Sequence, residues 1–226
     1  GFYFMNNVIV IGGPGPAVSI GNAIRHANQK FGCDIEFAGI LNDALAGQEI
    51  NNMPVLGKLS DAPAFEAQGY KFIFTIYKIG GQPQRIQLFN NLGIAESSLF
   101  TFIHPLAYVA PDAAIAPGVV IMPNANISHG TSIQLGSLIM SNAYIGHDTI
   151  VGKHCFVAAT SCTGSYVTVG DGVWIGFNAT IRGRQKVGRY AAIGIGSVVV
   201  SDIPDEELWI GNPARFHKKV TDTIRY

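Results

Sequence analysis

The sequence predicts a small α/β unit followed by a parallel β-helix that is built from six-residue repeats. Three observations predict this fold. Strand-like and helix-like stretches alternate before position 104, and aliphatic residues recur at every sixth position from Val109 to Val199. Glycine is abundant, with 27 of 226 residues. Only 13% of the residues are charged, against roughly 25% in ordinary globular proteins.

The N-terminal unit is predicted over residues 6–104. Its expected strands cover 7–12, 35–41 and 71–77, and its expected helices cover 19–30, 61–69 and 82–92. Strands that alternate with helices predict a parallel, Rossmann-like α/β sheet. Ligands of such sheets bind beyond the carboxyl ends of the strands.

The six-residue repeat predicts the second domain, over residues 105–204. Fifteen of the sixteen repeat positions hold Ile or Val, and a small or β-branched residue usually follows four positions later. A helix, with its period of 3.6, cannot produce a strict period of six. Three consecutive repeats form one triangular coil, with the aliphatic side chain inside and glycine, Asn or Asp in the turns, where φ is positive. A short tail is expected over 205–226.

Composition excludes several classes of protein. The chain is 48% hydrophobic and has 15 basic and 15 acidic residues, which argues against disorder and against a nucleic-acid partner. No apolar run is long enough for a membrane span. The three cysteines, Cys33, Cys155 and Cys162, match no zinc or redox spacing, so we expect free thiols and a cytoplasmic protein.

The coil length of three repeats places His129, His147 and Ser165 in one outward-facing column. A pair of exposed histidines on a prism suits a cleft between subunits. His147 could also be a solvated turn residue, and His129 could serve packing or the rim of a substrate site. His104 is expected to be structural, at the junction of the two domains.

Further motifs surround the repeats: Asn42-Asp43, Met53 to Gly57, Ile103-His-Pro105, Gly146-His-Asp148 and Trp209 to Arg215. Together they resemble the two-domain bacterial acetyltransferases that include sialic acid O-acetyltransferases and N-acetyltransferases of nucleotide-linked 4-amino-sugars. The resemblance implies a left-handed β-helix, a homotrimer, acetyl-CoA as co-substrate and a nucleotide-sugar as acceptor. It also implies a role in surface polysaccharide biosynthesis.

By this resemblance, His147 is the general base of acetyl transfer, and Asp148 orients its ring. An amine or hydroxyl that attacks a thioester must lose a proton, and histidine, with an ordinary pKa of about 6.5, suits that task. Direct contact between His147 and Asp148 requires a turn, because adjacent strand residues face opposite sides. Asp148 could instead be a simple turn-forming residue.

The resemblance also implies the binding residues. Acetyl-CoA would bind Ser165, Gly164, Phe177, Gly194 and Ile195, in a groove between prisms, and the Ser165 N–H would stabilise the oxyanion. The cluster Arg182, Arg184 and Lys186 would contact phosphates or be simply solvated. The nucleotide-sugar would contact Gly12, Gly13, Gly15 and Asp43, in a loop that is not a complete dinucleotide fingerprint.

The sequence departs from the family at three acceptor-side positions, which hold Pro16, Phe156 and Met140 where histidine, histidine and asparagine are usual. The favoured function is N-acetylation of a nucleotide-linked amino-sugar. Sugar O-acetylation and a non-catalytic binding or assembly module stay open. A zinc hydratase of the carbonic anhydrase type would need three histidines such as His129, His147 and His154, whose spacing does not fit, so no metal is expected.

Overall fold

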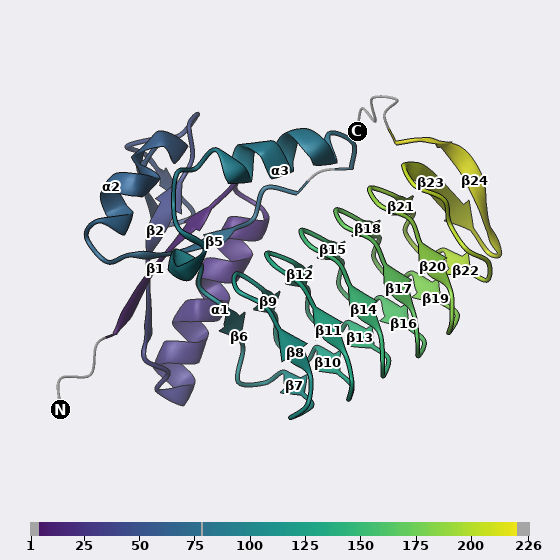
Figure 1. Ribbon diagram of the computed structural model, residues 1–226. Helices are drawn as coiled ribbons and strands as arrows, with labels where there is room; N and C mark the ends of the chain where they lie inside the picture. Colours follow the sequence, from purple (N-terminus) through teal and green to yellow (C-terminus); the bar gives the residue numbers. More distant parts are fainter. Residues whose placement is uncertain (1–4, 78, 221–226) are drawn as a thin grey trace.

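The computed structural model describes residues 5–77 and 79–220, which form an α/β unit and a three-sided prism of short strands (Figure 1). The five-stranded sheet of the unit has the order β3-β4-β2-β1-β5; its strands are parallel except for the short antiparallel β3–β4 pair at the edge. Its elements are β1 (Asn6–Ile11), α1 (Pro16–Phe31), β2 (Ile35–Leu41), β3 (Glu49–Ile50), β4 (Met53–Gly57), η1 (Leu59–Asp61), α2 (Ala62–Glu66), β5 (Lys71–Phe74), α3 (Gln82–Asn90) and η2 (Glu96–Ser98). Because β2 and β5 lie on opposite sides of β1, the chain changes direction in the sheet at the carboxyl end of β1, where ligands of such sheets bind.

The unit differs from the prediction at several element ends and in one hairpin; α2, for example, is shorter than the predicted 61–69. Helix α1 begins at Pro16 rather than at residue 19, because proline is pre-organised for the first helical turn. Strand β5 ends at Phe74, since Tyr77 leaves the sheet and its hydroxyl donates to the Gly136 carbonyl of the prism. The hairpin of β3 and β4, which was not predicted as strands, turns at Asn51 and Asn52, both with positive φ.

The prism consists of two-residue strands that stack in parallel. They are β6 (Phe102–Ile103), β7 (Tyr108–Val109), β8 (Ala114–Ile115), β9 (Val120–Ile121), β10 (Asn126–Ile127), β11 (Ser132–Ile133), β12 (Leu138–Ile139), β13 (Tyr144–Ile145), β14 (Ile150–Val151), β15 (Phe156–Val157), β16 (Cys162–Thr163), β17 (Thr168–Val169), β18 (Trp174–Ile175), β19 (Thr180–Ile181), β20 (Lys186–Val187), β21 (Ala192–Ile193) and β22 (Val198–Val199). Ser132 pairs with Ile150 and Ile150 with Thr168, so one coil takes three repeats, as predicted. The left-handed sense of the winding stays a prediction.

Three sheets form the faces of the prism: a six-stranded face from β7 to β22, a five-stranded face from β8 to β20, and an eight-stranded face that contains β6 to β21. The repeat residues of the middle coils fill the interior and are buried. Buried hydroxyl groups between them are satisfied, because Ser137 donates to the Gly152 carbonyl at 2.7 Å and Thr149 to the Gly164 carbonyl at 3.1 Å. The interior is therefore apolar, with each of these polar atoms paired.

Gly, Asn and Asp occupy many turn positions with positive φ, as predicted, but the glycines directly after the aliphatic column serve close packing instead. A Cβ atom on Gly164 would lie 2.4 Å from the backbone nitrogen of Gly183 in the next coil, so close approach of the coils requires glycine there. Positive φ occurs two residues further on, at Asp148 (55°), Tyr166 (59°) and Arg184 (66°). The position of the positive-φ residue matters for the site, because it decides where the turn side chains point.

The α/β unit packs on the eight-stranded face. One buried cluster joins α1 to Val120, Leu138 and Phe156 on the outside of that face. At the start of the prism, His26 of α1 lies 3.0 Å from the ring nitrogen of buried His104. His104 thus lies in the interface between the two parts, as expected for a structural residue.

The stretch predicted as a tail contains a hairpin of β23 (Glu207–Gly211) and β24 (Ala214–Lys219). Strand β23 pairs with β21 and so extends the eight-stranded face. Residues 221–226 of the predicted tail lie outside the described residues. In the described part of the chain, no helix combines the length and the apolar character that crossing a bilayer requires.

Candidate functional site

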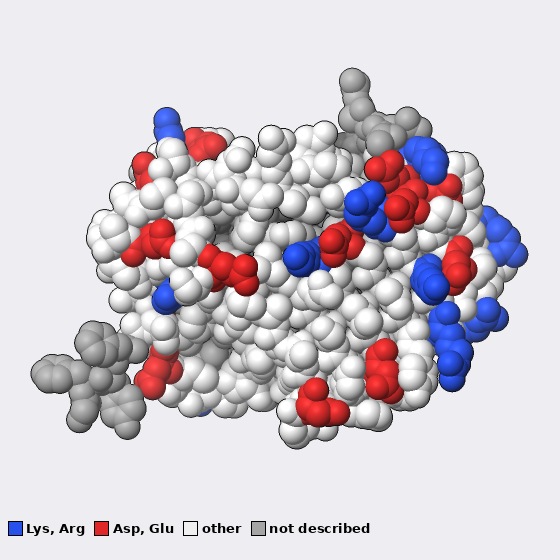
Figure 2. Space-filling model, viewed as in Figure 1, with Lys and Arg blue, Asp and Glu red and all other residues white. Residues whose placement is uncertain are grey.

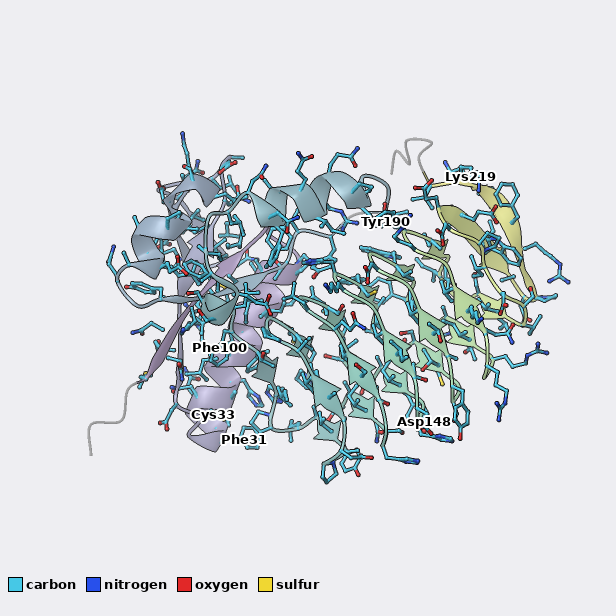
Figure 3. All side chains as sticks on the ribbon, viewed as in Figure 1. Phe31, Cys33, Phe100, Asp148, Tyr190 and Lys219 are labelled. Atoms are coloured by element: carbon cyan, nitrogen blue, oxygen red, sulfur yellow. The ribbon has the colours of Figure 1, made fainter. Side chains whose placement is uncertain are left out.

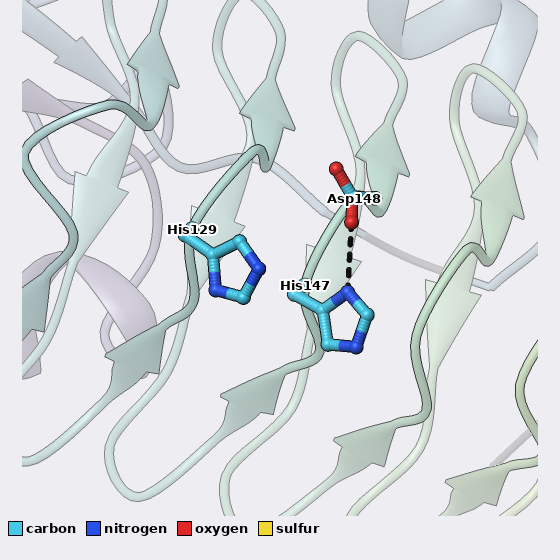
Figure 4. Close-up of side chains that lie close together, drawn as sticks. All are labelled: His129, His147 and Asp148. Carbon is cyan, nitrogen blue, oxygen red and sulfur yellow. Dashed lines mark hydrogen bonds and ion pairs between the residues drawn. The ribbon is translucent and has the colours of Figure 1, made fainter.

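His129 and His147 lie on the corner between the six-stranded and five-stranded faces (Figure 4). His147 stands in the turn between β13 and β14, and the register of one coil places His129 directly beside it. The two imidazole rings stack with centroids 4.8 Å apart and planes 5° apart. The predicted column of histidines is therefore present.

Asp148 contacts the histidine that precedes it. Its φ of 55° turns the backbone at this position, so that Nδ1 of His147 lies 2.7 Å from Oδ2 of Asp148 (Figure 4). The two side chains are 35% and 40% exposed. A Nδ1–H bond to the carboxylate leaves Nε2 of His147 as the hydrogen-bond acceptor of the ring.

Ser165 lies in the next turn of the same corner. The neighbouring N–H of Tyr166 donates to the His147 carbonyl at 2.9 Å, which ties the two turns together. Among the hydrogen bonds of the described residues, the Ser165 N–H has no acceptor. A free backbone donor thus lies one coil from the His147 ring.

Tyr166 and Arg184 extend this corner. From the sequence, Arg184 was predicted only as a possible phosphate contact, and Tyr166 was not identified. The Tyr166 ring lies 5.1 Å from the His147 ring at an interplanar angle of 82°. The Arg184 guanidinium lies 4.6 Å above the Tyr166 ring. The spacing of 18 residues places Asp148, Tyr166 and Arg184 at the same turn position of successive coils. That this position has a positive φ is known only from the structure.

Of the other predicted acetyl-CoA residues, Gly164 precedes Ser165 in the same turn, and Phe177, Gly194 and Ile195 lie at another corner of the prism. Phe177 and Ile195 are 48% and 76% exposed, in turns that follow strands of the eight-stranded face. Gly164 and Gly194 have a packing reason to be glycine, because a Cβ on Gly194 would meet the Ile210 side chain at 2.5 Å. Contact of these four residues with acetyl-CoA stays a prediction.

The Gly12–Gly15 loop connects β1 to α1, at the carboxyl end of the central strand. Gly13 and Gly15 border open space, whereas a Cβ on Gly12 would lie 2.0 Å from Oγ1 of Thr75. Asp43 follows β2 nearby, and its Oδ1 accepts from the Leu59 N–H at 2.8 Å. Among the described contacts, none joins this loop or Asp43 to His147.

The three departures from the family have different surroundings. Pro16 is the first residue of α1. Phe156 is buried against the α/β unit and stacks on Trp174 with ring centroids 4.2 Å apart. Met140 packs against the same cluster. At positions 156 and 140 the apolar side chains therefore contribute to the interface between the α/β unit and the prism.

His154 lies on a third corner, away from His129 and His147. It is 8% exposed, and its ring lies 4.6 Å from the Phe89 ring of α3. It lines a cavity of about 430 Å³ with Asn90, Lys153 and Asp171. Ligand atoms of His129, His147 and Asp148 lie within 4.8 Å of one another, but the chain does not bring together the three histidines that were weighed as zinc ligands.

The burial of His154 predicts a pH-dependent stability. Burial lowers the pKa of this histidine to about 4, although the Asp171 carboxylate opposes the shift. In the unfolded chain the group binds a proton below pH ~6.5, while in the folded chain it stays neutral until about pH 4. Stability is therefore lost as the pH falls from 6.5 towards 4, by about 3 kcal/mol from this group.

A His154→Asn variant tests this expectation, because Asn tolerates the positive φ of 53° at this position. The free energy of unfolding, measured with urea at pH 7 and pH 4.5, should fall less in the variant than in the wild type. Equal pH dependence in the two proteins would show that His154 is protonated as easily in the folded chain as in the unfolded one.

No model of a known protein family matches the chain. Curated relatives match short stretches. The dTDP-3-amino-3,6-dideoxy-alpha-D-galactopyranose 3-N-acetyltransferase of Aneurinibacillus thermoaerophilus is 52% identical over 44 residues, which are 20% of this chain and 23% of that enzyme. The galactoside O-acetyltransferase of Escherichia coli is 33% identical over 60 residues, 26% of this chain and 30% of that enzyme. In both cases the match spans less than a third of the relative.

Solved structures match nearly the whole chain. PerB from Caulobacter crescentus, in complex with CoA and GDP-perosamine, has a TM-score of 0.80 and 28% identity, covering 95% of this chain and 98% of PerB. The acetyltransferase domain of PglB from Neisseria gonorrhoeae, in complex with acetyl coenzyme A, has a TM-score of 0.79 and 26% identity, covering 94% and 99%. The predicted resemblance to hexapeptide-repeat sugar acetyltransferases is therefore confirmed.

Proposed function

We propose that the chain transfers the acetyl group of acetyl-CoA to the amino group of a nucleotide-linked amino-sugar, with His147 as the general base. The observation that carries this proposal is the exposed His147 ring, which Asp148 holds through Nδ1 at 2.7 Å, beside the free N–H of Ser165. The similarity to PerB, which was solved with CoA and GDP-perosamine, supports the choice of substrates.

The chemistry follows from this arrangement. As the acceptor nitrogen bonds to the thioester carbonyl carbon, its proton passes to Nε2 of His147. Asp148 stabilises the imidazolium that forms, and the Ser165 N–H donates to the oxyanion. When the C–S bond breaks, the CoA thiolate takes up the proton from Nε2, which restores the neutral histidine.

The free faces of the prism support a homotrimer. The outward residues of the six-stranded face include Tyr108 and Tyr144, 56% and 41% exposed, and those of the five-stranded face include Ile150. Figure 2 shows charged side chains gathering towards the C-terminal coils and only few over the other coils. Faces with few charges and with exposed aromatic and aliphatic side chains are typical of interfaces. We expect a solution mass of about three times the protomer mass of 24.1 kDa, and a protomer-sized particle would contradict the trimer.

A groove between two such prisms would hold the acetyl-CoA arm. Phe177 and Ile195 stand exposed at one edge of the six-stranded face, and His147 stands at its other edge. Arg182 and Arg184 lie in the turn between β19 and β20, and Lys186 begins β20; these three residues would meet phosphates. The Gly12–Gly15 loop and Asp43, at the carboxyl ends of β1 and β2, would hold the nucleotide-sugar.

A panel of UDP-, GDP- and dTDP-linked amino-sugars, incubated with acetyl-CoA, tests the proposal. Thiol release should occur with at least one of these acceptors, and the product should resist neutral hydroxylamine, because an amide is stable to it and an ester is not. Cleavage by hydroxylamine would instead indicate O-acetylation of a sugar. Tight binding of a nucleotide-sugar without any thiol release would favour a non-catalytic binding module.

A further inference from the structure

We propose that Tyr166 is a positioning residue for His147, and that Arg184 holds Tyr166 in place. The two residues continue the histidine stack, so that His129, His147, Tyr166 and Arg184 form a ladder of side chains along one corner of the prism. The role of Tyr166 in acetyl transfer rests on the proposed function, whereas its effect on the His147 ring does not.

The ladder holds the His147 ring from three sides. The His129 ring stacks parallel to it at 4.8 Å. The Tyr166 ring meets it nearly at right angles, with centroids 5.1 Å apart, a geometry that is favourable for aromatic pairs. The Asp148 carboxylate bonds Nδ1 at 2.7 Å. Tilting the ring out of its plane would break the contacts with His129 and Tyr166, and it would also move Nδ1 away from Asp148. The ladder therefore holds the ring in the plane in which Nδ1 reaches Asp148 and Nε2 stays free.

Tyr166 is itself held without burial. Its side chain is 47% exposed, and the Arg184 guanidinium lies 4.6 Å above its ring, within the range of a cation–π contact. The backbone N–H of Arg184 donates to the backbone carbonyl of Ser165 at 2.9 Å. Arg184 therefore supports Tyr166 and is anchored to the same turn that carries the free N–H of Ser165.

The backbone of Tyr166 has the left-handed conformation of its turn position. Tyr166 adopts a φ of 59°, and Gly130 and Gly172 occupy the equivalent position in other turns with a φ of 66°. A bulky residue in this left-handed conformation costs about 1 kcal/mol relative to glycine. Other turns also hold bulky residues at this position, among them Arg184 and Tyr190. What distinguishes Tyr166 is that its ring contacts the His147 ring.

The test removes the ring without straining the turn. A Tyr166→Gly variant suits the positive φ, and Tyr166→Phe keeps the ring. Tyr190→Gly is the matched control: it stands in the same turn position with a φ of 59° and has Arg189 5.2 Å above its ring. Tyr190 lies on the opposite edge of the prism from Asp148 (Figure 3).

The first readout needs no acceptor. Long-range ¹H–¹⁵N NMR spectra report which nitrogen of His147 carries the proton at neutral pH, and a His147→Gln variant assigns the signals. Wild type, Tyr166→Phe and Tyr190→Gly should show the Nδ1–H tautomer. Tyr166→Gly should show a mixture of both tautomers of His147. Arg184→Ala should shift the ratio of the two tautomers in the same direction. An unchanged tautomer in Tyr166→Gly would overturn the role of Tyr166, and an unchanged one in Arg184→Ala would overturn that of Arg184.

The second readout is the rate with an acceptor that the wild type acetylates. Tyr166→Gly should lower kcat about tenfold with KM nearly unchanged, because a misplaced base slows proton transfer more than it weakens binding. Tyr166→Phe should restore the rate. A wild type without activity on any acceptor would overturn the proposed function, while the NMR spectra would still decide the positioning of His147. Wild-type kcat in Tyr166→Gly would contradict the positioning role.

Discussion

A His147→Ala variant should lose 10²- to 10⁴-fold in kcat, the usual contribution of a general base. The KM for acetyl-CoA should change little, because the imidazole acts on the proton of the acceptor and the ring stands at the edge of the proposed groove. Steady-state rates of thiol release, at saturating acetyl-CoA and acceptor, measure this loss.

The matched control is His217→Ala, since His217 is exposed on β24, far along the chain from the histidine corner. Its kcat should equal that of the wild type. An Asp148→Asn variant should lose less than His147→Ala, because the base remains but its orientation and the stabilisation of the imidazolium are weakened. Wild-type kcat in His147→Ala would remove His147 from the mechanism.

Gly164→Ala should destabilise the prism strongly. The added Cβ would lie 2.4 Å from the Gly183 nitrogen and 2.8 Å from its Cα, and backbone atoms of a stacked coil cannot move aside as a side chain can. Overpacking of this kind costs about 3 kcal/mol, which corresponds to a fall in Tm of roughly 10 °C for a chain of this size. Thermal unfolding at a fixed protein concentration measures it.

The same variant separates two explanations of Gly164. If the glycine serves only the approach of acetyl-CoA, Tm should stay unchanged while the KM for acetyl-CoA rises. Gly13→Ala is the control, because its Cβ would meet nothing within 4 Å and its φ is not positive. Its Tm should lie within about 2 °C of the wild type, as is usual for an open site.

The stacking of the prism could be predicted from the sequence to single residues. A strict period of six fixes the length of the coil, because three repeats close one turn of the prism, and this period alone placed His147 beside His129. The repeat predicts the stacking because every interior position of the prism needs the same kind of side chain. The helices and strands of the α/β unit were placed less well at their ends, since those ends depend on single residues such as Pro16.

The remaining parts depend on geometry that a period does not show. The positive φ falls three residues after the aliphatic column, where Gly, Asn or Asp stands in many turns, as predicted, but where Tyr166 and Arg184 stand in others. Only this turn geometry brings Tyr166 to the His147 ring. The burial of Phe156 and His154 depends on where the α/β unit docks, a contact between distant segments that has no periodic signal.

Transfer of a ¹³C-labelled acetyl group from acetyl-CoA to a nucleotide-linked amino-sugar tests the central claim most directly. With the wild type, ¹³C NMR and mass spectrometry of the acceptor should show one labelled acetyl group, bound as an amide. Under the same conditions His147→Ala should give little or no product. The absence of labelled product with every acceptor, or equal product from the wild type and His147→Ala, would contradict the proposed mechanism.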